Sequence, residues 1–487
     1  MSVAGEVALA ETHSAVVFFI ADRAYKMKKP VDLGFLDFRD RAAREAVCHR
    51  EVELNRRLAP DVYLGVADVD DPDGQVCEHL VVMRRMPADR RLSTLVTEGA
   101  PVAHHLWHLA HLVAAFHARA ERSAAADAAA SAGALAGRWS DNTASLRQHG
   151  HVVDPATVER VQSLAMRYLE GRHRLFDARI AEGRACDGHG DMLADDVFCL
   201  DEGPQVLDCI EFDDELRYGD TLADVAFLAM DLERLGHPEL GEQFLRAYRT
   251  HADDTWPASL EHHHIAYRAQ VRAKVGAIRA AQGHGPSTDE ARRLLDLAER
   301  HLRAARVRLI LVGGLPGTGK STLAQAVGDA LGATVLRSDE VRKELVGLPS
   351  HEHAPAAFGE GIYTPAATAD TYAELATRAE VALAMGETVV LDASWSDEGQ
   401  RRLARDVADR THADAVELRC QVDQDVAVER IRARAAAGGD ASDATPAVAA
   451  AMAATADPWS TAVTIPTDRP PGVSAAEALD LIETATS

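Results

Sequence analysis

The segment from residue 309 to residue 322 constrains the fold of this 487-residue chain more than any other. An apolar run, Leu309–Val312, is followed by the glycine-rich sequence GLPGTGKS and then by a helical pattern. A strand–turn–helix unit of this kind turns backbone N–H groups around an anion, and the helix N-terminus adds positive potential. The spacing fits the phosphate-binding loop GxxxxGK[ST]. We therefore expect a nucleotide-phosphate site, the alternative being a glycine-rich turn that matches by chance.

The expected phosphate loop consists of Gly314, Leu315, Pro316, Gly317, Thr318, Gly319, Lys320, Ser321 and Thr322. Lys320 is expected to reach the β- and γ-phosphates, and the Ser321 hydroxyl is expected to hold Mg²⁺. The motif thus predicts ATP and Mg²⁺ as cofactors.

Two aspartates end the next apolar runs of this half. Strand-like and helix-like segments alternate after the loop, which indicates a parallel sheet covered by helices. Asp339 follows the run ATVLRS and Asp392 ends the run VVLD, so both should lie at the edge where such sheets bind ligands. Asp339 could orient an acceptor hydroxyl and take its proton, and Asp392 could hold the water shell of the metal. For each, a helix N-cap is the alternative.

The order GLPGTGKST, RSDEVRKEL, VVLDASW and VERIRARAA resembles the small P-loop kinases related to gluconate kinase, chloramphenicol phosphotransferase and zeta toxins, a predicted AAA-type kinase. The resemblance covers residues 305–487. It implies that a lid-like helix supplies Arg430 and Arg434 to the transferred phosphate and that Arg342 contacts the substrate. A solvated helix face with arginines four residues apart is the alternative for Arg430 and Arg434.

A second constellation of carboxylates lies between residues 189 and 211. The sequence HGDMLADD places Asp191 five residues before Asp196, and Asp208 follows on an expected hairpin. One carboxylate that positions a hydroxyl, with others that hold metal ions, is typical of kinase phosphoryl transfer. The same half carries Lys26 and Lys28 on an expected strand and Glu51 on an expected helix.

These features resemble aminoglycoside phosphotransferases and choline kinases, which share the protein-kinase-like fold, over about residues 8–280. The resemblance implies that Asp191 is the catalytic base, that Asp208 is a Mg²⁺ ligand and that Asp224 braces the catalytic loop. It also implies that Lys26 or Lys28 pairs with Glu51 and with the α- and β-phosphates.

The N-terminal half departs from this family in two places. Asp196 stands where the family has an asparagine; its carboxylate can still bind metal but adds negative charge. No GxGxxG loop precedes the lysines, and the candidate loop is Glu11–Ser14.

We expect an α+β protein-kinase-like domain at 1–281, a linker and helix at 282–304, and an α/β P-loop domain with a parallel sheet at 305–487. The net charge of −24 disfavours nucleic acid as a partner. No apolar run long enough to cross a membrane occurs, and the six scattered cysteines suit a reducing compartment, so we expect a cytoplasmic protein without membrane partners.

Together these observations predict an ATP-dependent phosphotransferase with two nucleotide sites, acting on a hydroxyl of a small molecule. One alternative is a catalytic P-loop half beside a ligand-binding pseudokinase. The other is a non-enzymatic, ATP-dependent switch. The sequence identifies neither the acceptor nor the oligomeric state.

Overall fold

The computed structural model describes residues 8–11, 14–32, 37–349, 352, 359–437 and 442–484. Contacts divide the chain into two compact units. The N-terminal unit contains residues 1–162, 176–256 and 261–302, and the C-terminal unit contains residues 163–175, 257–260 and 303–487. The domain limits expected from the sequence remain predictions. Among the described helices, none is both long and apolar enough to cross a lipid bilayer.

The N-terminal unit begins with a five-stranded antiparallel sheet of order β1-β2-β3-β5-β4. Its strands are β1 (Ala8–Glu11), β2 (Ala15–Ile20), β3 (Arg23–Lys28), β4 (Tyr63–Asp70) and β5 (Val76–Arg84). Apolar and β-branched residues dominate β2 and β5, which favours the extended backbone. Helix α1 (Arg41–Asn55) connects β3 to β4 and buries Val47, Cys48, Glu51 and Val52. This spacing of three and four residues forms one helix face.

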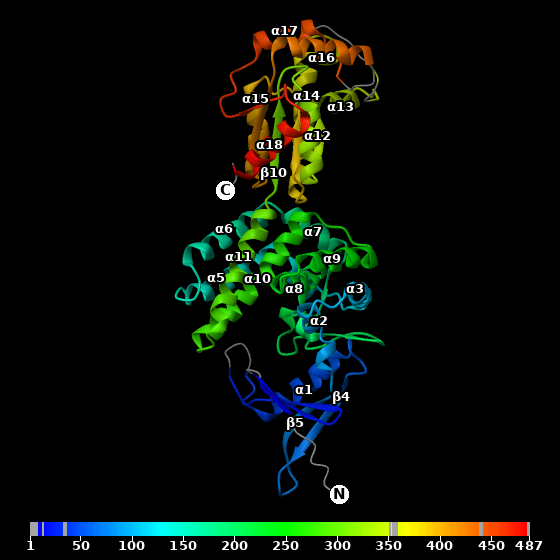
Figure 1. The fold of residues 1–487 in the computed structure, drawn as a ribbon, viewed down its shortest axis with the longest axis vertical. Helices are drawn as coiled ribbons and strands as arrows, with labels where there is room; N and C mark the ends of the chain where they lie inside the picture. Colours follow the sequence, from blue (N-terminus) through cyan, green and yellow to red (C-terminus); the bar gives the residue numbers. More distant parts are fainter. Residues whose placement is uncertain are drawn as a thin grey trace. The chain divides into compact units, whose positions relative to one another are not determined.

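Helices make up most of the remainder of this unit, as the labels in Figure 1 show. The helices between β5 and residue 305 are α2 (Leu92–Thr97), α3 (Ala103–Arg119), α4 (Ala124–Ala130), α5 (Ala132–Arg147), α6 (Pro155–Glu170), α7 (His173–Ala181), α8 (Thr221–Arg234), α9 (Pro238–Ala252), α10 (Ala258–Ala281) and α11 (Pro286–Ala304). Parts of α6, α7, α10 and α11 belong to the C-terminal unit. Two short strand pairs flank the carboxylates between residues 189 and 211. They are β6 (Ala185–Asp187) with β9 (Tyr218–Asp220), and β7 (Val197–Leu200) with β8 (Gly203–Val206). The short 3₁₀ turns are η1 (Ala88–Arg90), η2 (Ala194–Asp196) and η3 (Asp214–Leu216).

The C-terminal unit contains a five-stranded parallel sheet of order β11-β12-β10-β13-β14. The strands are β10 (Arg308–Gly313), β11 (Thr334–Arg337), β12 (Val389–Asp392), β13 (Asp414–Gln421) and β14 (Val463–Pro466). The helices are α12 (Lys320–Leu331), α13 (Ser338–Leu345), α14 (Pro365–Ala384), α15 (Glu398–Arg410), α16 (Gln424–Ala437), α17 (Pro446–Thr455) and α18 (Pro471–Thr484), with the 3₁₀ turn η4 (Gly361–Tyr363).

Strand β10 lies at the centre of the parallel sheet. Its residues Leu309–Val312 are fully buried, and Ile310 and Val312 share a core with Leu323 and Val327 of α12 and Ile482 of α18. Val312 pairs with Asp392, so the ends of β10 and β12 meet at one sheet edge. The predicted fold class, an α+β unit followed by an α/β unit with a parallel sheet, is confirmed.

Candidate functional sites

The phosphate loop connects β10 to α12, as the sequence predicts, and its shape depends on glycine. Gly317 and Gly319 have φ values of +82° and +84°, where residues with a Cβ are strained. The loop is also closely packed. A Cβ at Gly317 would lie 2.4 Å from the carbonyl oxygen of Ala427 in α16, and one at Gly313 would lie 2.3 Å from the Trp459 ring. Glycine therefore provides both the turn and the close approach of neighbouring segments.

Hydrogen bonds hold the loop from two sides. The Thr318 hydroxyl donates to the Leu315 carbonyl at 2.8 Å, and the Thr467 hydroxyl donates to the Thr318 carbonyl at 2.5 Å. The Arg430 guanidinium donates to the Thr467 carbonyl at 2.8 Å and lies near Gly319, where a Cβ would be 3.5 Å from its Nη1. The predicted Arg430 is thus brought to the loop. Arg434 lies one helical turn further along α16.

Lys320 and Asp339 line one cavity of about 590 Å³ in the C-terminal unit, together with Pro316 of the loop. Lys320 is the first residue of α12, and Asp339 lies in the first turn of α13. The Lys320 ammonium forms no ion pair with any residue that the structure describes. A lysine without a carboxylate partner can neutralise the phosphates of a ligand.

Arg342 lines the same cavity and is fixed by its neighbours. Its guanidinium stacks on the Tyr363 ring at 4.9 Å and donates to the Ile362 carbonyl at 3.0 Å and to the Thr368 hydroxyl at 3.1 Å. Sequence analysis did not identify Tyr363 or Thr368, because no motif marks them.

Asp392 lies at the end of β12 and is 3% exposed. Its Oδ2 accepts a hydrogen bond from Arg337 at 3.3 Å, whereas its buried Oδ1 has no hydrogen-bond partner among the described residues. A buried carboxylate oxygen without a partner is unfavourable unless an ion or water binds there. Asp392 and the Ser321 hydroxyl therefore suit the oxygen-ligand chemistry of Mg²⁺.

The N-terminal unit brings two lysines and three carboxylates together. Lys26 Nζ contacts Glu51 Oε1 at 2.9 Å and Asp208 Oδ1 at 2.7 Å, and Lys28 Nζ contacts Glu51 Oε2 at 2.6 Å and also Glu211. Both candidate lysines thus bind Glu51, and Lys26 alone reaches Asp208. We call this group the lysine–carboxylate cluster.

Charge in the lysine–carboxylate cluster follows from these contacts. The Lys26 ammonium lowers the pKa of Asp208 to about 2. Burial opposes the charge of Glu51, but Lys26 and Lys28 outweigh it and hold the pKa of that carboxyl below its usual value. Burial raises the pKa of Glu211, which sequence analysis did not single out as a site residue.

Asp191 and Asp196 lie in a different environment. Burial, with the nearby charges of Asp208 and Asp191, raises the pKa of Asp196 well above its usual value. Burial also raises the pKa of Asp191, although Arg272 lies 3.7 Å from its carboxylate and opposes the shift. The extra negative charge expected of Asp196 is thus disfavoured. The candidate loop Glu11–Ser14 includes Thr12 and His13, which lie outside the described residues.

The loop that carries Asp191 is held rigidly by Asp224. The Asp224 carboxylate accepts the backbone N–H groups of His189 and Gly190, both at 2.8 Å, and lies 3.0 Å from His117 Nε2. These contacts are those of the brace predicted for Asp224.

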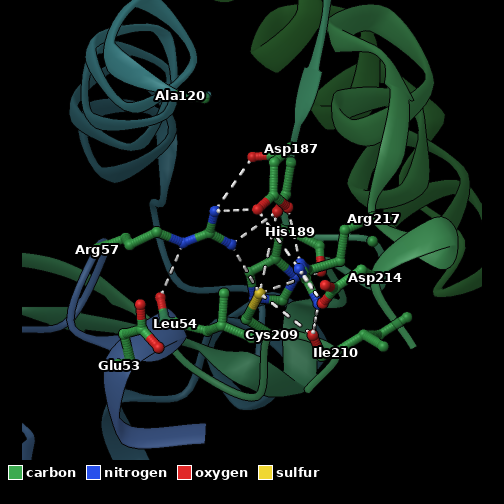
Figure 2. Close-up of polar contacts among 12 residues, drawn as sticks. Glu53, Leu54, Arg57, Ala120, Asp187, His189, Cys209, Ile210, Asp214 and Arg217 are labelled. Atoms are coloured by element: carbon green, nitrogen blue, oxygen red, sulfur yellow. Dashed lines mark hydrogen bonds and ion pairs between the residues drawn. The ribbon is translucent and has the colours of Figure 1, made fainter. Parts of the chain in front are cut away.

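Two arginines support the same loop (Figure 2). Arg57 donates to the Gly188 carbonyl at 2.9 Å and lies 3.2 Å from the Asp187 carboxylate. Arg217 contacts Asp187 at 2.7 Å and donates to the Ile210 carbonyl at 2.8 Å. The loop therefore has fixed charges on both of its flanks, which no sequence motif indicated.

Among the described residues, no group of three or more His, Cys, Asp or Glu side chains has the arrangement of a metal site. The metal roles of Asp196, Asp208, Asp392 and Ser321 remain predictions.

Comparison with known proteins extends these observations. The family described as "AAA domain" matches residues 309–459. Uncharacterized proteins from Mycobacterium tuberculosis and Mycobacterium bovis are 46% identical over 461 residues, which cover 94% of this chain and 92% of theirs. The chain belongs to the family of these mycobacterial proteins. Members of this family thus share both units, since the match spans nearly the full length of each.

Solved structures resemble each half separately. A choline/ethanolamine kinase family protein from Mesorhizobium loti aligns with a TM-score of 0.38 and 17% identity, over 62% of this chain and 92% of its own. A gluconokinase from Sinorhizobium meliloti aligns with a TM-score of 0.28 and 17% identity, over 37% of this chain and 93% of its own.

Proposed function

We propose that the protein is an ATP-dependent phosphotransferase whose C-terminal unit transfers the γ-phosphoryl group to a hydroxyl of a small molecule. The observation that carries this proposal is the placement of the phosphate loop, Lys320 and Asp339 around one cavity. The similarity of the kinases named above supports the same reaction class.

The residues of the C-terminal site have distinct roles in the proposal. The loop amides and Lys320 bind the β- and γ-phosphates, and Arg430 adds positive charge beside the loop. The Asp339 carboxylate orients the acceptor hydroxyl and accepts its proton. Mg²⁺, held through Ser321 and Asp392, would neutralise phosphate charge when bound.

The lysine–carboxylate cluster supports a second nucleotide site in the N-terminal unit. The Lys26–Glu51 ion pair at 2.9 Å corresponds to the pair that positions nucleotide phosphates in kinases. Asp208 contacts Lys26 and would be a metal ligand. Asp191 would be the base, on the loop that Asp224 braces. A pseudokinase or an ATP-dependent switch is the alternative.

Substitution of the two key residues tests the proposal. Lys320→Ala should abolish ATP binding at the C-terminal site, and Asp191→Asn should remove N-terminal transfer while leaving nucleotide affinity intact. Calorimetric titration with ATP and Mg²⁺ counts the sites, and mass spectrometry of a pool of hydroxyl metabolites detects the added phosphate. Unchanged ATP binding in Lys320→Ala would contradict the C-terminal assignment. Activity that Asp191→Asn leaves unchanged would favour the pseudokinase, and binding without any transfer would favour the switch.

A further inference from the structure

A cavity of about 510 Å³ lies beside Asp191 in the N-terminal unit. Its walls come from α5, α10, the loop around Asp191 and the segment 210–220. This volume falls in the range of small-molecule sites, about 300–1,000 Å³. The residues of the lysine–carboxylate cluster do not line the cavity, which therefore adjoins Asp191 on another side.

Five basic side chains line this cavity: Arg138 from α5, Arg217 from the segment 210–220, and Arg268, Arg272 and Lys274 from α10. Three of them lie within seven residues of α10, which gathers positive charge on that wall. Positive charge gathered on one wall of a cavity focuses a positive potential on a ligand bound there.

The cations of this wall are mostly bound to neutral groups. Lys274 Nζ donates to the Asn142 amide oxygen at 2.7 Å. Arg268 donates to the Ala223 carbonyl at 2.8 Å and stacks on Phe227, and Arg138 donates to the Ala129 carbonyl at 2.5 Å. The other two pair with carboxylates: Arg272 with Asp191 at 3.7 Å, and Arg217 with Asp187 at 2.7 Å and Asp214 at 2.6 Å.

The wall also contains an uncompensated donor. The Nδ2 of Asn142 is buried and has no hydrogen-bond partner among the described residues. Burial lowers the pKa of Lys274, which means that its ammonium is kept from water without full compensation. An anionic oxygen in the cavity would satisfy both groups.

The acidic residues of the cavity do not cancel this charge. Asp220 is bound by Arg179 at 2.7 Å, and Asp224 is occupied by the loop N–H groups. Asp213 is half-buried and accepts the backbone N–H of Glu215 at 3.0 Å. Asp141 and Glu215 are exposed to solvent, where water screens their charge. The surface offered to a ligand is therefore positive on the α10 side, and the proton acceptor Asp191 lies beside Arg272 of that helix.

We infer that the acceptor of the N-terminal site is a hydroxyl compound that also carries an anionic group, either a phosphate or a carboxylate. This inference rests on the proposed second kinase site. The acceptor oxygen forms a bond to the γ-phosphorus, the bond from that phosphorus to the bridging oxygen of ADP breaks, and the hydroxyl proton passes to Asp191. The anionic group binds Arg272 and Lys274, so a cationic acceptor is excluded by repulsion.

Calorimetry on the full chain tests this assignment in two stages. The protein is first titrated with a non-hydrolysable ATP analogue and Mg²⁺, which fills the nucleotide sites and measures the proposed function by itself. Glycerol 3-phosphate, glycerate and glycerol are then titrated at fixed ionic strength. We expect both anions to bind and glycerol not to bind, and the tighter anion distinguishes a phosphate site from a carboxylate site.

Four variants assign the binding to this cavity. Arg272→Gln and Lys274→Gln should each weaken anion binding about tenfold or more, since each removes a charge-assisted hydrogen bond. Arg246→Gln removes an exposed arginine of α9 and should leave binding unchanged. Arg272→Lys retains the charge and should restore most of the affinity, which separates loss of charge from loss of fold.

Either of two results would overturn the inference: no binding of the anions, or binding that Arg272→Gln and Lys274→Gln leave unchanged. Failure of nucleotide binding with anion binding retained would instead contradict the second kinase site and support the cavity as a site for anions.

Discussion

Replacing Gly317 by alanine should show how much the close packing of the phosphate loop contributes to stability and ATP binding, beyond the effect of its backbone conformation. At φ +82° an alanine costs about 1–2 kcal/mol in the left-handed region. Its Cβ would also lie 2.4 Å from the Ala427 carbonyl oxygen, a distance at which the loop or α16 must move. Overpacking of this kind typically costs about 1–3 kcal/mol.

Gly332 offers a matched control in the same unit. It follows α12 with φ +59°, and a Cβ there would meet nothing within 4 Å. Gly332→Ala should therefore lower the free energy of unfolding by about 1 kcal/mol through backbone strain alone.

The measurements are urea unfolding and calorimetric titration with ATP and Mg²⁺. We expect Gly317→Ala to lose about 1–3 kcal/mol more stability than Gly332→Ala and to bind ATP at least about tenfold more weakly at the C-terminal site, because displaced amides no longer converge on the phosphates. If Gly317→Ala bound ATP as tightly as Gly332→Ala, contact with α16 would not set the shape of the loop, and the reasoning would be refuted.

The remaining predictions concern the N-terminal unit. Because burial and the charges of Asp208 and Asp191 raise the folded-state pKa of Asp196 above the unfolded value of 3.8, the contribution of Asp196 to native stability should fall as pH rises from about 4 through that folded pKa. In thermal melts without Mg²⁺, Asp196→Asn should therefore melt above the wild type at pH 7.5, with a gap that closes toward pH 4.5; a gap independent of pH would contradict this. Asp224→Asn should lower kcat of the N-terminal reaction more than it changes the Kd of ATP, since it loosens the loop that bears Asp191, and steady-state kinetics with nucleotide titration measure both. Glu51→Gln should instead weaken ATP binding at this site, because Lys26 and Lys28 lose their shared carboxylate; unchanged affinity would contradict that role.

The phosphate loop and the alternation of strands and helices could be predicted because their signals are local. Residues Leu309–Val312 and the following glycines specify strand, turn and helix within about one dozen positions. The resemblance to kinases implied that Lys26 or Lys28 pairs with Glu51, and both lysines contact that carboxylate.

The packing around the sites could not be predicted, because it depends on segments distant in the chain. Ala427 touches Gly317 across 110 positions, and nothing in either local sequence marks the contact. Lys28 and Glu211 form a second ion pair that sequence spacing does not reveal. The basic residues of α10 beside Asp191 have only a weak signal in the sequence. Arg268 and Arg272 are spaced four residues apart, a spacing that surface helices also show.

Trp395 and Trp459 both lie against Gly313 at the base of the phosphate loop. The other three tryptophans of the chain, Trp107, Trp139 and Trp256, belong to the N-terminal unit. Indole emission of a chain with those three replaced by phenylalanine would therefore act as an intrinsic optical gauge of the C-terminal site, with no dye attached. Changes in that emission would follow how fast the loop takes up its ligand.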